Sequence, residues 1–196
     1  MISWPIWISG ALFALVHSLF ATQLCKVSFY RLGMSAQRYR LLYSTFATLL
    51  TAFWLIYIYQ LPDLPLYKID GGLRWFLILM QMGGGTVALL SLRSFDTRLF
   101  LGLSASSDDP EPFHEHGLYR YMRHPMYSGV MLLLLASPTQ SVNSFNFALI
   151  ISFYFIAGSW LEERRMLSSH PQYANYRRRV YAFIPCRTLL TTLRRS

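Results

Sequence analysis

Two short motifs of this chain carry side chains that could bind the two ends of a zwitterion. The first ends with Arg123 and His124, directly before Pro125 and an apolar run. Proline is favoured in the first turn of a helix, so Arg123 and His124 are placed at a helix N-terminus, which suits a carboxylate or a phosphate. The alternative is an arginine that snorkels to the membrane surface beside a histidine that caps the helix.

The second motif is the pair Glu162–Glu163, which follows the last long apolar run. Two adjacent carboxylates at a membrane boundary are costly unless they are solvated or paired. They could pair with the neighbouring Arg164 and Arg165. Alternatively, one carboxylate faces the first motif and binds a cationic group. An anion site and a cation site that face each other suit a zwitterion, such as an amino acid moiety.

Three further groups of residues are candidates for chemistry. His17 lies within an otherwise apolar run, so it is either a functional residue or a neutral histidine bonded to a neighbouring helix. Tyr173 and Tyr176 fall at helical spacing near a run of arginines, and they belong either to a surface helix or to the roof of a cofactor pocket. His114 and His116 lack further ligands at supporting spacing, so no metal site is predicted.

The composition places these residues in a membrane protein. Hydrophobic residues make up 54% and charged residues 14% of the 196 residues, whereas soluble domains carry roughly 25% charged residues. The last of four long apolar runs contains the turn signal Ser137–Gln140, which divides it into two helices. We therefore expect one membrane domain (residues 1–196), all-α, with five transmembrane helices and a short amphipathic C-terminal helix on the cytoplasmic side. The four runs are Ile2–Cys25, Leu41–Leu61, Trp75–Leu92 and Pro125–Leu161.

The distribution of basic residues predicts the orientation in the membrane. Of the 18 Lys and Arg residues, only Lys68 and Arg74 fall in loops on one side. The positive-inside rule then places the N-terminus outside and the C-terminus in the cytoplasm, which for a bacterium indicates the inner membrane. The net charge of +9 is attributed to this orientation and not to nucleic-acid binding. Cys25 and Cys186 both fall on the reducing side, so no disulfide is expected.

Taken together, the motifs resemble those of the isoprenylcysteine carboxyl methyltransferase and phospholipid methyltransferase superfamily, small membrane enzymes that use S-adenosylmethionine. The resemblance covers residues 93–186 and follows the order G-x-Y-x-x-x-R-H-P-x-Y, helical hairpin, E-E, Y-x-x-Y and I-P. The runs HSLFAT, YRLLYSTFATLL and FDTRLFLGL resemble the bacterial methanethiol S-methyltransferase branch. The matching residues are Gly117, Tyr119, Arg123, His124, Pro125, Tyr127, Glu162, Glu163, Tyr173, Tyr176 and Pro185.

The resemblance implies methylation of a small thiol or another lipophilic acceptor, with isoprenylcysteine carboxyl methylation as the next choice. Arg123, His124 and His17 are the catalytic candidates, and the sequence does not choose between the two histidines as the base. The lipid bilayer is the other expected partner, and the oligomeric state is not predicted. The residues implied to line the S-adenosylmethionine site are Tyr119, Arg123, His124, Pro125, Tyr127, Glu162, Glu163, Tyr173 and Tyr176.

Two other functions remain as alternatives. A membrane sterol or enone reductase shares the Arg-His-x-x-Tyr theme but uses a nicotinamide, and its pattern after the last span contains Asp and Cys. This chain has Glu162–Glu163 at that place. A non-catalytic membrane subunit gives no reason for polar motifs to gather at one face of the bilayer.

Overall fold

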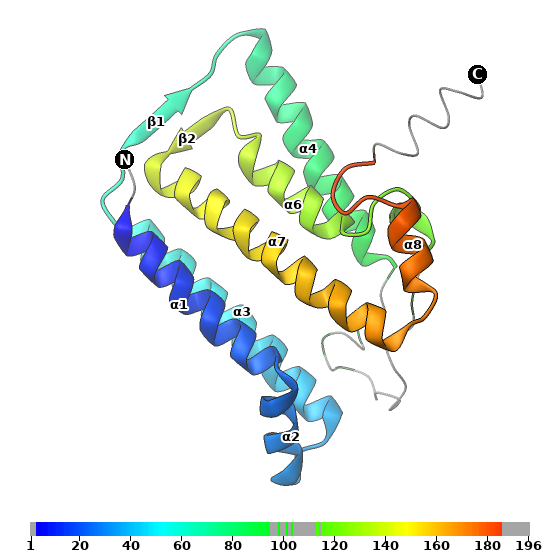
Figure 1. Ribbon diagram of the computed structural model, residues 1–196. Helices are drawn as coiled ribbons and strands as arrows, with labels where there is room; N and C mark the ends of the chain where they lie inside the picture. Colours follow the sequence, from blue (N-terminus) through cyan, green and yellow to red (C-terminus); the bar gives the residue numbers. More distant parts are fainter. Residues whose placement is uncertain are drawn as a thin grey trace, which may run out of the picture. The chain divides into compact units, whose positions relative to one another are not determined.

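The computed structural model describes residues 3–94, 98, 101, 103, 113 and 115–185, and this part of the chain is mostly helical (Figure 1). Four helices are long and apolar enough to cross a membrane, namely α1, α3, α4 and α7. The helices are α1 (Trp4–Ala21), α2 (Gln23–Arg31), α3 (Ala36–Gln60), α4 (Gly72–Leu92), α6 (Pro125–Leu135), α7 (Val142–Ser169) and α8 (Tyr173–Arg179). A 3-10 turn, η1 (Gly117–Arg120), and two short strands, β1 (Pro65–Lys68) and β2 (Thr139–Ser141), are also present.

These elements confirm an integral membrane protein built mainly from helices. The fourth of the five predicted spans corresponds to α6, which has 11 residues. A helix of that length extends only about 16 Å, whereas the hydrocarbon core measures about 30 Å. The turn within Ser137–Gln140 does separate α6 from α7. The two strands were not predicted, and β2 includes the end of this turn.

The chain forms two compact units, each assembled from segments that are distant in the sequence. The first contains Met1–Leu66, Asp96–Asp109 and Gln140–Ile150, and the second contains Tyr67–Phe95, Pro110–Thr139 and Ile151–Ser196. The functional motifs between Tyr119 and Tyr176 fall in the second unit, whereas His17 falls in the first.

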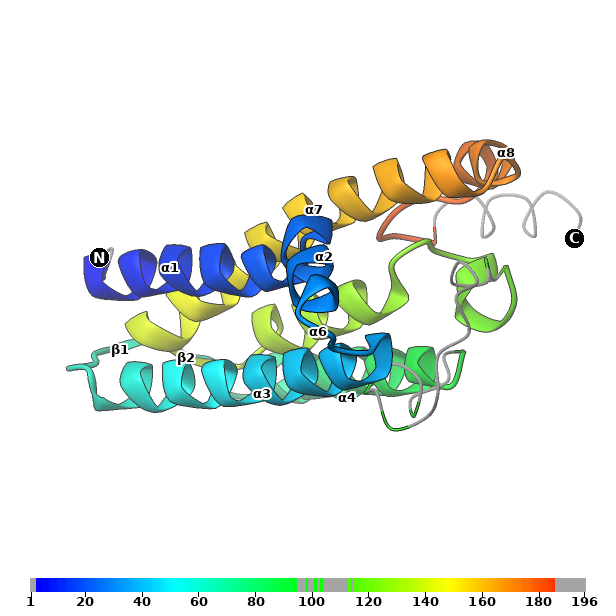
Figure 2. The same cartoon turned by 90° about the horizontal axis from the view of Figure 1, so that it is seen from below.

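In the first unit, the apolar run expected to continue to Cys25 is interrupted at Thr22. Helix α1 ends at Ala21, and the Thr22 hydroxyl accepts a hydrogen bond from the Cys25 amide at 3.3 Å. A threonine at this position caps the next helix, so a new helix begins at Gln23. Figure 2 shows α2 turning away from the axis of α1. Thr22 and Gln23 therefore do not continue the helix that carries His17.

Side-chain hydrogen bonds join the helices of the first unit within apolar surroundings. The Trp7 indole donates to Asn146 Oδ1 at 2.7 Å, and the Trp54 indole donates to Ser9 Oγ at 3.0 Å. Each of these polar groups would be costly in lipid without its partner. Apolar side chains such as Phe53, which is 67% exposed, cover much of the outer surface, as a surrounding bilayer requires.

In the second unit, helices α4 and α6 lie side by side (Figure 1) and approach closely through two glycines. A Cβ atom added to Gly84 would lie 2.7 Å from the carbonyl oxygen of Gly129 and 2.8 Å from the amide nitrogen of Leu133. Only a residue without a side chain permits this separation of the backbones. The contact matters for function because α6 begins directly after Arg123 and His124.

The glycine contact predicts different effects for two adjacent substitutions. Gly84→Ala should lower the free energy of unfolding by about 1–3 kcal/mol, because the new methyl group overlaps backbone atoms that cannot move aside. Gly83→Ala is the matched control, since a Cβ at Gly83 meets nothing within 4 Å. Thermal unfolding of the detergent-solubilised variants measures both. Equal melting temperatures for Gly84→Ala and the unmodified protein would rule out this close contact.

Candidate active site

The candidate site is assembled where the chain enters α6. His124 is the N-cap residue of α6 and Pro125 is the first residue of the helix, but the His124 side chain makes no capping hydrogen bond. The C-terminal segment holds this entry in place. The amide of Arg123 donates to the carbonyl of Tyr181, and the amide of His124 donates to the carbonyl of Ala182, both at 2.9 Å. The backbone contacts leave the Arg123 and His124 side chains available for α7.

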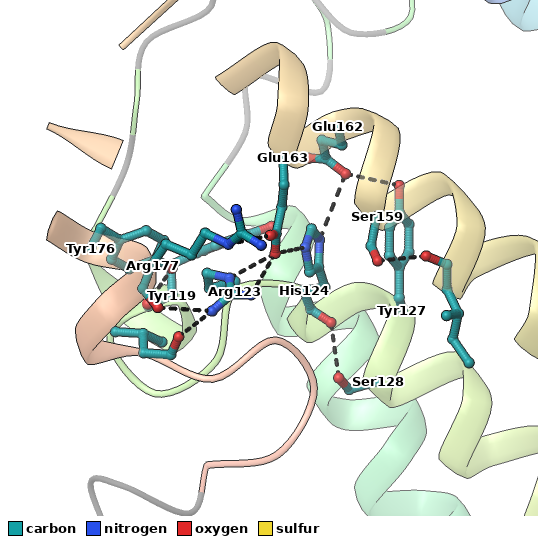
Figure 3. A network of polar contacts seen from close by, with 12 residues as sticks. Tyr119, Arg123, His124, Tyr127, Ser128, Ser159, Glu162, Glu163, Tyr176 and Arg177 are labelled. Carbon is teal, nitrogen blue, oxygen red and sulfur yellow. Dashed lines mark hydrogen bonds and ion pairs between the residues drawn. The ribbon is translucent and has the colours of Figure 1, made fainter. Parts of the chain in front are cut away.

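Glu163 of α7 lies at the centre of the resulting network (Figure 3). Its Oε1 atom lies 2.7 Å from both Nε and Nη2 of Arg123 and 3.1 Å from Nε2 of His124. Its Oε2 atom lies 3.1 Å from Nε of Arg177. The Glu163 side chain is only 7% exposed. A buried carboxylate needs compensation of this kind, and Glu163 obtains it from residues distant in the sequence.

Arg123 links Glu163 to the end of α8. Besides its two contacts with Glu163, its Nη1 atom donates to the carbonyl oxygens of Arg177, at 3.2 Å, and of Val180. The Arg123 side chain is 11% exposed. Its donors are thus directed toward groups of the protein itself, although the sequence placed it at an anion site. The geometry supports a role in holding three segments together.

The neighbouring Glu162 has a different environment. Its side chain is 38% exposed, and its Oε2 atom accepts a hydrogen bond from the Tyr127 hydroxyl at 3.2 Å. The same oxygen lies 3.6 Å from Nδ1 of His124. No ion pair joins either glutamate to Arg164 or Arg165 within the described residues. Of the two carboxylates, Glu162 is therefore the more exposed to an external cation.

The tyrosines of the C-terminal motif are buried and connect elements around the site. Tyr173 is 4% exposed and Tyr176 is 2% exposed, and both rings contact the ring of Phe113, with centroids 5.5 Å and 5.1 Å away. The Tyr176 hydroxyl donates to the carbonyl of Tyr119 at 2.7 Å, which joins α8 to η1. Burial raises the pKa of the Tyr173 and Tyr176 hydroxyls above the ordinary tyrosine value. Both side chains are therefore neutral at physiological pH.

A small cavity lies beside the network. Its volume is about 160 Å³, and Trp160, Glu163, Arg164 and Arg177 line it. Pockets for whole small-molecule ligands measure roughly 300–1,000 Å³. This cavity therefore suits only a fragment the size of an amino acid moiety, and it offers groups of both signs to that fragment.

The structure brings five of the sequence-predicted residues into one network: Arg123, His124, Tyr127, Glu162 and Glu163. Pro125 is buried at the helix start, and the three tyrosines brace the network. The sequence analysis missed Arg177, although its place in an arginine run beside the two tyrosines was visible. Nothing in the sequence pointed to Trp160 or to the carbonyls of Tyr181 and Ala182.

His17 has its own environment in the first unit. Its ring lies 5.6 Å from that of Phe13, and its Nε2 atom lies 3.3 Å from the Tyr43 hydroxyl. This contact fits the alternative of a histidine bonded to a neighbouring helix, and it equally allows a role in proton transfer. Of the other candidates, Cys25 is a free thiol and Glu115 pairs with Arg179 at 2.9 Å. His114 and Cys186 lie outside the described residues.

The unequal environments of the two glutamates predict unequal effects on stability. Glu163→Gln should lower the free energy of unfolding by about 3 kcal/mol, because the buried Arg123 loses its compensating charge. Glu162→Gln should change it by less than about 1 kcal/mol, since a partly exposed pair contributes little. Unfolding curves in detergent compare the two. A similar loss for both variants would contradict the division of roles described above.

Comparisons with known proteins are consistent with the motifs. The chain is 28% identical over 200 residues to the methanethiol S-methyltransferase of Pseudomonas deceptionensis, covering 93% of this chain and 74% of that protein. For methanethiol S-methyltransferase 2 of Bradyrhizobium diazoefficiens the identity is 27%, over 89% of this chain and 70% of the relative. The protein of the same name from Crocosphaera subtropica is 28% identical over 89% of this chain and 71% of its own length.

No family model matches the sequence, and no solved structure matches it. The alignments with the three relatives nevertheless extend well beyond residues 93–186. They confirm that this membrane protein resembles the bacterial methanethiol S-methyltransferase branch of the superfamily.

Proposed function

We propose that the protein is an S-adenosylmethionine-dependent membrane methyltransferase whose acceptor is a small thiol. The names of its relatives support this assignment, and their alignments cover about nine-tenths of the chain. The observation that carries it is the pair of adjacent carboxylates at the end of α7. One is buried in a network that orders three segments, and the other is exposed beside that network.

The residues present fit the charges of S-adenosylmethionine. Its amino acid moiety carries an ammonium and a carboxylate, and its sulfur is a cationic sulfonium. Glu162 would hold a cationic group, while Arg164 and Arg177 beside the small cavity would hold the carboxylate. When bound, the cofactor supplies an activated methyl group. Because this donor is already cationic, the protein has to align it and needs no further electrophilic group.

The acceptor thiol requires a second contribution from the protein. The thiolate is the nucleophile, so the thiol must lose its proton before or during attack on the methyl carbon. Nδ1 of His124 lies 3.6 Å from Oε2 of Glu162, and Nε2 lies 3.1 Å from Oε1 of Glu163. We therefore assign His124 the role of positioning the two carboxylates. We propose His17 as the acceptor-side base, because it is an ionisable residue within an apolar span.

A binding experiment tests the cofactor assignment. Titration calorimetry with S-adenosylhomocysteine should detect binding to the purified protein, and Glu162→Gln should weaken it about tenfold while leaving the melting temperature nearly unchanged. Removal of one charge-assisted hydrogen bond accounts for this factor. A transfer assay with methyl-labelled S-adenosylmethionine should label methanethiol-sized thiols in preference to prenylcysteines and ethanolamine lipids. Binding of NADPH without binding of S-adenosylhomocysteine would support the reductase alternative.

Substitution of His17 tests the proposed base. His17→Ala should reduce turnover about 100-fold, which is typical of the loss of a general base, and should leave the affinity for S-adenosylhomocysteine unchanged. His17→Gln can still bond to Tyr43 but cannot accept the proton, so it should be equally inactive and better folded. If His17→Gln has the same turnover as the unmodified protein, His17 is a packing residue only.

We also propose five membrane crossings, with the N-terminus outside and the C-terminus in the cytoplasm. Contacts between the segment that joins α3 to α4 and the turn that follows α6 support this arrangement. In the second unit the amide of Ile69 donates to the carbonyl of Pro138 at 2.8 Å, and the Tyr67 hydroxyl donates to the carbonyl of Ser137 at 3.1 Å. In this arrangement α6 crosses together with the residues that follow it, and four such residues add at most about 13 Å to its length.

Cysteine labelling tests the orientation. In a protein with Cys25 and Cys186 replaced by serine, Ser141→Cys should react with a membrane-impermeant maleimide from outside intact cells, because the positive-inside rule leaves this turn outside. Arg165→Cys should react only after the membrane is opened. The reverse pattern would overturn the proposed orientation.

A further inference from the structure

A second cavity of the second unit, whose lining includes neither Glu162 nor Glu163, has no role in the function proposed above. Its volume is about 480 Å³, which is within the range of small-molecule sites. Basic and apolar side chains line it together. The lining residues include Leu90, Arg93, His116, Leu118, Arg120 and Tyr121.

Two arginines, Arg93 and Arg120, line this cavity. Neither Arg93 nor Arg120 forms a side-chain hydrogen bond or ion pair with another residue that the structure describes. Glu115, the described carboxylate nearest in sequence to Arg120, is engaged with Arg179 at 2.9 Å. Two arginines at one cavity are suited to the oxygens of a phosphate, which they can bind through paired hydrogen bonds.

The dipole of α4 opposes the binding of a phosphate beside Arg93 only in part. Arg93 is the C-cap residue of α4, and the C-terminus of a helix carries the equivalent of about half a negative charge. Two full positive charges outweigh it. The ordinary role of Arg93, complementing the dipole and anchoring α4 at the membrane surface, leaves Arg120 unexplained because η1 is not part of a membrane-spanning helix.

The surroundings favour a lipid as the source of the phosphate. Arg93 directly follows the membrane-spanning helix α4, so it lies at the depth of the headgroups. In the adjoining turn of α4, Leu89 is 68% exposed and Leu92 is 40% exposed, and such residues contact acyl chains. Leu90 and Tyr121 continue this apolar surface into the cavity. A dissolved anion would gain no binding energy from contact with these apolar side chains.

We propose that this cavity binds the headgroup phosphate of an anionic phospholipid, with Arg93 and Arg120 as its ligands. Lipid binding can be tested separately from the methyl transfer proposed above, because neither Arg93 nor Arg120 contacts Glu163.

The purified full-length protein in detergent provides the test. Retention of phosphatidylglycerol is measured by native mass spectrometry and compared with that of phosphatidylcholine. The double variant Arg93→Gln/Arg120→Gln should bind phosphatidylglycerol at least about tenfold more weakly, because each arginine near a membrane surface contributes to the attraction of anionic lipid. The matched control is Arg31→Gln/Arg38→Gln, which removes the same charge from other exposed positions and should change binding less than twofold.

Two more measurements keep the outcome unambiguous. The melting temperature of each variant is determined without added lipid, and the single variants Arg93→Gln and Arg120→Gln replace the double variant if it unfolds. Inorganic phosphate and NADPH are added separately to the unmodified protein. Equal losses in the double variant and its control would overturn the proposal, as would stabilisation by inorganic phosphate or NADPH that matches the effect of phosphatidylglycerol.

Discussion

The burial of Glu163 is the constraint on which the rest of the second unit depends. Moving an ion into a protein interior costs several kcal/mol even after relaxation, so a carboxylate that is 7% exposed has to be surrounded by donors. One donor, Arg123, comes from the entry to α6, and the other arginine, Arg177, comes from α8. Three segments are thereby held in one place by one side chain. The arrangement defines the end of the membrane domain where charged residues gather.

The same constraint explains why two adjacent glutamates differ in role. Neighbouring residues on an α-helix point about 100° apart, so Glu162 does not share the buried position of Glu163. It remains 38% exposed and bonded to the edge of the network through Tyr127. Because Glu163 is fixed in place, the adjacent and more exposed Glu162 can be presented to a cationic ligand in a fixed geometry. Mutual repulsion of the two acids is limited because Arg123 and Arg177 compensate the inner one.

Sequence reasoning found the four long membrane helices and most residues of the polar network because these features are local. Uncharged runs specify the spans, and the Arg-His-Pro and Glu-Glu motifs are visible as short strings. The break at Thr22 was missed because a capping hydroxyl within an apolar run does not change the hydropathy. Arg177 was missed as a partner of Glu163 for another reason. Arg164 and Arg165 are closer in sequence, but only the folding of α8 against the entry to α6 decides that Arg123 and Arg177 bind the carboxylate.

The 3-10 turn η1 connects the two proposed sites. The carbonyl of Tyr119 within it receives the Tyr176 hydroxyl, which belongs to the aromatic cluster that braces α8 and so Arg177. Arg120, the next residue, lines the cavity proposed for an anionic lipid. A headgroup bound to Arg120 would restrict η1, and the restriction would extend through Tyr119 and Tyr176 to the segment that compensates Glu163. Such coupling requires a difference in lipid affinity between the ordered and the loosened network. The bilayer would then stabilise the arrangement that presents Glu162, in addition to surrounding the helices.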